Sequence, residues 1–167
     1  MRTAVLTLLL ALSFSGFSQS KIAYVNIDEL ITTMPETKAA EVEMKKLAES
    51  IQSDLRFLEE EYQNQVTELE NGMNTGWSQL MIKTKQEALY GTQQKIYEFQ
   101  QSAQQEITQK EVELMEPIIE KLQNAVNEVA KAQKVDYVLD SSVSKGVVIF
   151  KDGGTDLSPM VKAKLGM

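Results

Sequence analysis

The sequence predicts an α+β chain in which a small body of short strands and helices carries one long antiparallel α-helical hairpin. Two polar helical patterns with an eleven-residue apolar repeat occupy the middle of the chain, separated by a turn rich in glycine and asparagine. Three short runs rich in β-forming residues lie outside this region, one before it and two after it. We therefore expect the body to be assembled from both ends of the chain.

The first residues have the composition of an export signal. "MR" supplies a positive charge, and "AVLTLLLALSFSGF" supplies an apolar run that is short of the ~20 residues of a membrane span. Gly16 and Ser18 are small residues suited to the −3 and −1 positions of a cleavage before Gln19, and cleavage after Ser20 is the alternative. We expect residues 1–18 to be removed and the mature protein to act outside the cytoplasm.

The composition argues against several classes of activity. The chain has no cysteine and no histidine, which excludes thiol nucleophiles, imidazole bases and zinc sites built from sulfur and nitrogen ligands. Carboxylate pairs such as Glu59 with Glu60 fall on exposed helical faces, where no shielded pocket separates their pKa values. A net charge of −7 argues against binding to nucleic acid. We expect no enzymatic activity, no metal site and no cofactor.

The body begins with a strand and a connector. "KIAYVNI", residues 21–27, alternates apolar and polar residues and predicts a strand, and "DELITTM" predicts a short helical turn. Thr33 and Glu36 have the spacing of a capping box around Pro35. A long helix should therefore start here.

The outgoing helix of the hairpin carries a single apolar stripe. From Pro35 to about Glu70 there is no glycine and no further proline. Apolar residues recur in steps of 4, 4, 3, 4, 4, 3 and 4, at Leu47, Ile51, Leu55, Leu58, Tyr62, Val66, Leu69 and Met73. Three turns in eleven residues, about 3.67 residues per turn, keep such a stripe nearly straight. One apolar stripe on a polar helix requires a partner.

The partner is predicted to be the following segment, residues 78–113. Its apolar side contains Leu89, Ile96, Phe99, Ala103, Ile107 and Leu114, and Ile118 continues the row. Asn71-Gly72 and Gly76 are turn and helix-stop signals between the two helices. Residues 35–113 should thus form an antiparallel hairpin with its tip near 71–77 and arms of roughly 50 Å at about 1.5 Å per residue.

The C-terminal part completes the body, which we assign to residues 19–34 and 114–167. Pro117 is expected to interrupt the helix, so that residues 117–134 form a separate amphipathic helix. "VDYVLD" (135–140) and "GVVIF" (146–150) predict two further strands, and "KDGGTD" predicts a turn. Ser158 and Pro159 have N-cap and N1 chemistry for a last short helix.

Three segments in this order resemble the Skp (OmpH-like) family of periplasmic chaperones: "KIAYVNIDELITTMPE" after an export signal, the long charged helical pair, and "AKAQKVDYVLDSS" near the C-terminus. The resemblance covers essentially the whole mature chain. It implies a homotrimer in which short strands from three subunits form a small β-barrel-type trimerisation body. Three hairpins would surround a cavity that holds unfolded outer-membrane β-barrel proteins and prevents their aggregation without ATP. It also implies a periplasmic location.

Edge strands support this assembly on physical grounds. Three short strands alone leave unpaired edges and a one-sided core, which strands from other subunits would cover. The candidates for the shared core are Ile22, Tyr24, Val135, Tyr137, Leu139, Val147 and Ile149. The alternative is a monomeric three-stranded sheet covered by helices 117–134 and 159–165.

Apolar residues near the tip and on the return arm are the candidates for contact with unfolded clients. They are Met73, Trp77, Leu80, Met81, Ile82, Tyr90, Tyr97 and Phe99. Met73 and Trp77 also extend the eleven-residue rows, so they have two interpretations. Either they pack in the seam between the helices, or they contact a client, a lipid surface or a neighbouring arm.

The charge of the arms departs from the family pattern, in which the best-known members are strongly basic. Residues 36–113 contain 15 acidic and 8 basic side chains. We therefore do not expect this chain to have the lipopolysaccharide site of its basic relatives, and client capture should depend more on apolar contacts.

The alternative function is a structural coiled-coil spacer or adaptor of the cell envelope that binds a folded partner. A spacer should have apolar residues only in the seam, whereas a holdase should expose others.

Overall fold

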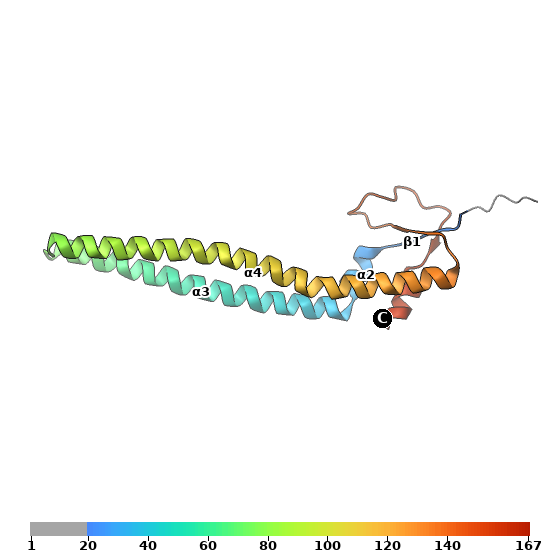
Figure 1. Cartoon of the computed structure of the whole chain (residues 1–167), viewed down its shortest axis with the longest axis horizontal. Coiled ribbons are helices and arrows are strands. Elements are labelled where there is room, and N and C mark those ends of the chain that lie inside the picture. The colour runs from blue at the N-terminus through green and yellow to red at the C-terminus, as the bar shows by residue number, and fades with distance from the viewer. Residues whose placement is uncertain (1–19) are drawn as a thin grey trace, which may run out of the picture. The chain divides into compact units, whose positions relative to one another are not determined.

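The computed structural model describes residues 20–167, so the proposed export signal, residues 1–18, lies outside the described residues. The elements are, in order, β1 (Ile22–Val25), α2 (Ile27–Thr33), α3 (Pro35–Asn74), α4 (Gln79–Gln133), β2 (Tyr137–Asp140), β3 (Thr155–Asp156) and α5 (Ser158–Leu165) (Figure 1). This composition of elements confirms the predicted α+β class. Within residues 20–167, every helix is too short or too polar to cross a bilayer.

The chain divides into two compact units, and α4 belongs to both. One unit comprises Ile31–Lys121, and the other comprises the described residues up to Leu30 together with Leu122–Met167. The first contains the helical hairpin, and the second contains the sheet, α2 up to Leu30, the end of α4, and α5.

Helices α3 and α4 form the predicted antiparallel hairpin (Figure 1). Three ion pairs cross between them, and in each the carboxylate belongs to α3 and the ammonium group to α4. Glu36 pairs with Lys121, Glu43 with Lys110 at 3.7 Å, and Glu68 with Lys85 at 2.6 Å. The partners on α4 run backwards as those on α3 run forwards, which defines the antiparallel register. Exposed pairs of this kind contribute at most about 1 kcal/mol each, so burial along the seam has to supply most of the pairing energy.

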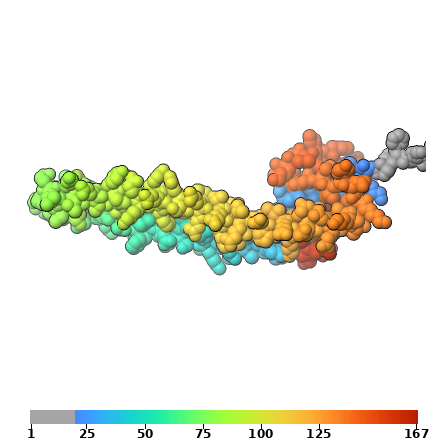
Figure 2. Space-filling model, viewed as in Figure 1, coloured from blue at the N-terminus to red at the C-terminus, as the bar shows by residue number. Residues whose placement is uncertain are grey.

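The apolar seam follows the predicted positions closely. Leu47, Ile51, Leu55, Leu58, Tyr62, Val66 and Leu69 of α3 are all half-buried. On α4, Leu89, Ile96, Phe99, Ile107 and Leu114 are half-buried, and Ala103 and Ile118 are buried. Figure 2 shows the two helices in contact on the face in view. Met73 departs from the predicted row, since it is exposed beyond the end of the buried stripe.

The predicted break at Pro117 is wrong, because α4 continues through it as one helix of 55 residues. Proline removes one intrahelical hydrogen bond and costs roughly 3 kcal/mol in a helix interior. Ile118, the next residue, and Leu122, one helical turn later, are both buried. Each fully buried apolar side chain of this size contributes about 1.5–3 kcal/mol, so burial after the proline is enough to keep the helix continuous.

Two predicted helix caps are also wrong. The N-cap of α3 is Met34, which is fully buried and makes no side-chain cap hydrogen bond, so Thr33 is not the cap of a capping box. The N-cap of α5 is Leu157, and Ser158 is already helical. The Ser158 hydroxyl instead accepts a hydrogen bond from the backbone N–H of Asn26, which ties α5 to the end of β1. The start of α5 is capped locally by another residue, because Oδ1 of Asp156 accepts a 2.9 Å hydrogen bond from the Ser158 N–H.

The sheet is parallel, with the order β2-β1-β3. Its third strand is Thr155–Asp156, so the predicted strand at residues 146–150 is wrong. That segment is a loop in which Gly146 has a φ of +61° and Ile149 is 96% exposed. Neither of the strand pairings among residues 20–167 includes it, so its β-forming residues lack a backbone partner within the described chain.

The two faces of the sheet have different surroundings. Ala23 and Val25 of β1 are buried in the core of this unit. The other buried apolar residues of the unit are Leu30, Leu122, Ala125, Val126, Val129, Leu157 and Val161. Ile22 and Tyr24 point to the opposite face, because side chains alternate along a strand, and neither is buried. The core therefore covers only one side of the sheet.

Candidate functional site

At the tip of the hairpin, the indole ring of Trp77 lies against Gly72. Gly72 is buried inside α3, and a Cβ atom at this position would lie 2.2 Å from Cδ2 of Trp77. The backbone N–H of Trp77 also donates a 3.0 Å hydrogen bond to the Gly72 carbonyl. Gly72 was predicted as a turn residue, but its role is to leave room for the ring. Gly76, with a φ of +83°, is the residue whose left-handed backbone makes the turn.

One charged group of α4 lies near the same ring, and it is paired with a carboxylate of α3. The ammonium group of Lys85 lies 5.8 Å from the centre of the Trp77 ring and 2.6 Å from Oε1 of Glu68. The first distance is near the outer limit of a cation–π contact. Trp77 is half-buried, so the ring closes the end of the seam and keeps part of its surface free. This geometry corresponds to the seam interpretation, and a contact of Trp77 with a client stays a prediction.

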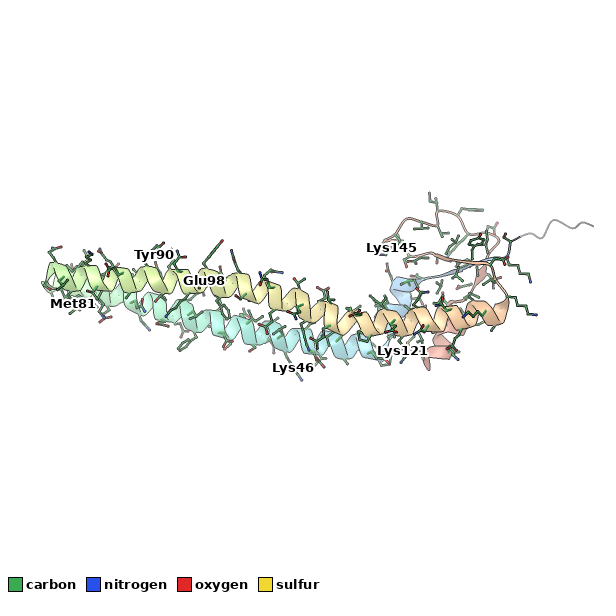
Figure 3. All side chains as sticks on the ribbon, viewed as in Figure 1. Lys46, Met81, Tyr90, Glu98, Lys121 and Lys145 are labelled. Carbon is green, nitrogen blue, oxygen red and sulfur yellow. The ribbon has the colours of Figure 1, made fainter. Side chains whose placement is uncertain are left out.

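The other apolar residues predicted near the tip are largely outside the seam. Met73, Leu80 and Met81 are exposed, Leu80 to 76%, and only Ile82 is half-buried. Figure 3 shows Met81 near the start of α4, close to the turn. The end of the hairpin thus presents three flexible apolar side chains to solvent.

The aromatic residues of the return arm separate into two groups. Tyr90 and Tyr97 are 64% and 58% exposed, and they lie seven residues apart, which places them on the same face of α4. Figure 3 shows Tyr90 on the side of α4 turned away from α3. Phe99 is half-buried and belongs to the seam. At least one of these three rings was expected to face away from the partner helix, and two do.

Four exposed apolar residues of the two long helices were not anticipated. They are Val42 and Phe57 on α3 and Val112 and Ile119 on α4. All four fall outside the eleven-residue rows, and this position could have predicted from the sequence that they are exposed. An apolar residue off the seam of a two-helix hairpin has no partner helix to cover it.

In the sheet unit, four of the seven candidates for the shared core lie together on one face. The register pairs Ile22 with Tyr137 and Tyr24 with Leu139. Tyr137 is well exposed, and Ile22 and Leu139 are partly so. Val135 is half-buried just before β2, whereas Val147 and Ile149 lie in the exposed loop. The structure therefore groups the strand residues and separates the loop residues from them.

The loop between β2 and β3 partly covers this face. A hollow of about 370 Å³ is lined by Ile22, Tyr24, Leu139, Val148, Phe150, Lys151, Asp152, Gly153 and Gly154. The Lys151 ammonium group lies 4.6 Å from the centre of the Tyr24 ring. The loop leaves an apolar face that is incompletely covered within one chain.

A hydrogen-bond network fixes the end of β2 to the start of α2. Oδ1 of Asp140 accepts bonds from the Ser142 hydroxyl at 2.6 Å, the Ser142 N–H at 2.9 Å and the Ile27 N–H at 3.4 Å. Burial alone would raise the pKa of Asp140, but the hydrogen bonds from Ser142 and Ile27 outweigh it and hold this pKa below its usual range. The network is structural, and it positions the strand that carries Tyr137 and Leu139.

Residues 20–167 contain no group of three or more aspartate or glutamate side chains arranged to hold a metal ion. The chemistry that the exposed groups provide is contact with apolar and hydrogen-bonding surfaces.

Comparisons with known proteins agree on one family. The profile of the family described as Outer membrane protein (OmpH-like) matches residues 21–165. Chaperone protein Skp of Photorhabdus laumondii is 24% identical over 155 residues, which cover 92% of this chain and 93% of the relative. Chaperone protein Skp of Pectobacterium atrosepticum is 24% identical over 159 residues, with coverages of 95% and 96%. A crystal structure of an OmpH-like protein from Caulobacter crescentus has a TM-score of 0.74 at 17% identity, covering 90% of this chain and 86% of that one, and it supports the fold.

Proposed function

This chain belongs to the OmpH-like family, and we propose that it is an ATP-independent periplasmic holdase that binds unfolded outer-membrane β-barrel proteins and prevents their aggregation. The relatives named Skp are chaperones, so the chain is not an enzyme. In this proposal, residues 1–18 direct export, residues 19–34 and 114–167 form the body, and residues 35–113 form the client-binding arm.

The observation that carries the proposal is the set of apolar side chains exposed away from the seam. Leu80, Tyr90 and Tyr97 are more than half exposed on α4, and Phe57 is similarly exposed on α3. A spacer that binds a folded partner would need apolar residues only where its helices meet. Apolar side chains on several outward faces suit a client without a defined shape, because many weak contacts together retain it while each exchanges quickly. Methionine at the tip adds adaptable contacts.

The trimer in this proposal is supported by the uncovered face of the sheet. Ile22, Tyr137 and Leu139 are partly or largely exposed in one chain, and β2 and β3 are the two edges of the sheet that residues 20–167 form. Unpaired edges next to apolar side chains favour pairing with another copy. We propose that these residues, with Tyr24, Val135, Val147 and Ile149, form the core shared by three subunits.

The electrostatics of capture differ from those of a basic arm. With 15 acidic and 8 basic side chains in residues 36–113, the arm does not favour lipopolysaccharide or other polyanions. The acidic side chains instead keep the arms soluble and separate. A contact of the exposed tip residues with a membrane surface would be apolar and weak.

Light scattering tests the proposal directly. The molar mass of the mature protein is measured alone and after a urea-denatured outer-membrane β-barrel has been diluted into it. We expect the mass of a trimer, an increase by the mass of the client, and suppression of the turbidity that the client develops alone. A trimer that does not bind the client would favour the function of a structural spacer. A monomer would exclude a body shared by three subunits.

A further inference from the structure

One outward face of α4 carries a continuous line of exposed, uncharged side chains. We call it the neutral stripe. Its members follow one another in steps of 4, 3, 4, 4, 3 and 4 residues: Tyr90, Gln94, Tyr97, Gln101, Gln105, Thr108 and Val112. This spacing places all seven on one side of a helix, and all seven are exposed. Figure 3 shows the position of Tyr90, the first of them, on the side away from α3.

The corresponding line on α3 differs in charge. The same steps on its outward side give Val42, Lys46, Glu49, Ser53, Phe57, Glu60 and Asn64, which are also all exposed. Three of these seven are charged, as is usual for a face that is only solvated. On α4, charged residues such as Glu98 and Glu111 lie to either side of the neutral stripe and not within it. Solubility therefore does not account for the missing charges.

The side chains of the neutral stripe suit a peptide backbone. A glutamine amide both donates and accepts hydrogen bonds, as a peptide group does, and the threonine and tyrosine hydroxyls do the same. Tyrosine adds a large contact area at a low cost in conformational entropy. Covering an uncharged amide also costs less desolvation energy than covering an ammonium or carboxylate group.

A shallow hollow lies at the Val112 end of the stripe. It has a volume of about 430 Å³ and is lined by Gln104, Gln105, Thr108, Gln109 and Val112, all from α4. An uncharged recess with one apolar residue offers a place for a client side chain beside the backbone contacts.

We infer that the neutral stripe is a track for an extended segment of unfolded polypeptide, held by its peptide groups and apolar side chains rather than by its charges. From Tyr90 to Val112 the helix rises roughly 33 Å, which about ten extended residues span. Segments of about ten residues with alternating hydrophobicity are the unit of outer-membrane β-barrel sequences. The inference rests on the proposed holdase function and assigns capture mainly to the return arm.

Two double substitutions test the stripe. Gln94→Glu/Gln105→Glu places two charges in it, and Gln52→Glu/Gln63→Glu places the same two charges, also eleven residues apart, at exposed positions of α3. Glutamate and glutamine have similar helix propensities, so both variants should fold, which circular dichroism and Trp77 emission would verify. The two variants have the same net charge, and any general electrostatic effect is therefore equal in both.

The readout is the dissociation constant for a labelled outer-membrane β-barrel diluted from urea, at low and at high salt. We expect the stripe variant to bind roughly fivefold or more weakly at both salt concentrations, as the loss of one or two net hydrogen bonds implies, and the α3 variant to bind like the wild type. Equal affinities of the two variants, whether reduced or unchanged, would overturn the stripe while leaving the holdase function intact. A wild-type protein that neither binds the barrel nor suppresses its turbidity would overturn both.

Discussion

Replacing Gly72 by alanine should displace the only tryptophan of the chain from its place at the tip. A Cβ atom at residue 72 would lie 2.2, 2.3 and 2.5 Å from Cδ2, Cε3 and Cε2 of Trp77. Non-bonded carbon atoms pack at about 3.5–4.0 Å, so the ring has to move by more than ~1 Å or leave the contact. Both the substituted residue and the ring it meets lie near the turn of the hairpin.

The magnitude follows from two opposing contributions. A tryptophan side chain buries roughly 150–250 Å² when fully covered, so the half-buried ring has about 100 Å² to lose. At about 25 cal/mol per Å², this loss costs about 2.5 kcal/mol. Alanine is favoured over glycine inside a helix by about 1 kcal/mol, which offsets part of the loss. We expect the tip to be destabilised by about 1–2 kcal/mol.

Tryptophan fluorescence reports this change without interference, because Trp77 is the only tryptophan. The variant should show red-shifted emission, greater quenching by acrylamide and a lower urea midpoint of the emission change. The matched control is Gly91→Ala, which also lies inside a helix but where an added Cβ meets nothing within 4 Å. The control should keep the wild-type emission and gain up to about 1 kcal/mol of stability.

One outcome would contradict the packing of the Trp77 ring on Gly72. If Gly72→Ala kept the wild-type emission and gained stability as Gly91→Ala is expected to do, the ring would not lie on Gly72. Gly72 would then be an ordinary helical position of α3 with no packing role toward Trp77.

Three further predictions concern the body and the client. Asp140→Asn should lower the free energy of unfolding by roughly 1–3 kcal/mol at neutral pH, because the carboxylate accepts hydrogen bonds from Ser142 and Ile27. Since the folded state lowers the pKa of Asp140, this stabilisation is complete above the unfolded pKa of about 3.9 and disappears as the pH falls through the lower folded value. Urea unfolding therefore measures the difference in the free energy of unfolding between wild type and variant at neutral pH and below pH ~4, and this difference should be smaller in acid. A difference that does not change with pH would contradict a stabilising role of the Asp140 carboxylate. Trp77→Ala should leave the proposed trimer intact but weaken retention of a denatured barrel in a pull-down, whereas unchanged retention would restrict Trp77 to the seam. Val147→Asp should prevent assembly by burying an unpaired charge, and a trimer that survives in sedimentation would place Val147 outside the shared core.

The hairpin was predictable because its determinants are local and repeated. The eleven-residue rows from Leu47 to Leu69 specify which side of α3 is covered, and the rows through Ile96 and Ile107 do the same for α4. A turn signal between two such stripes leaves antiparallel pairing as the simplest arrangement. The first two strands were predictable for a similar reason, since alternation over four residues needs no knowledge of the partner strand.

Tertiary structure decided the features that depend on distant partners. Residues 146–150 have the composition of a strand, but no described strand pairs with them, and Thr155 and Asp156 pair with β1 instead. Gly72 has the sequence context of a turn, yet the ring of Trp77 makes it a packing position. Pro117 should end a helix, but burial of the residues that follow keeps α4 continuous. In each case a local preference of a few kcal/mol at most was outweighed by contacts that form only in the folded chain.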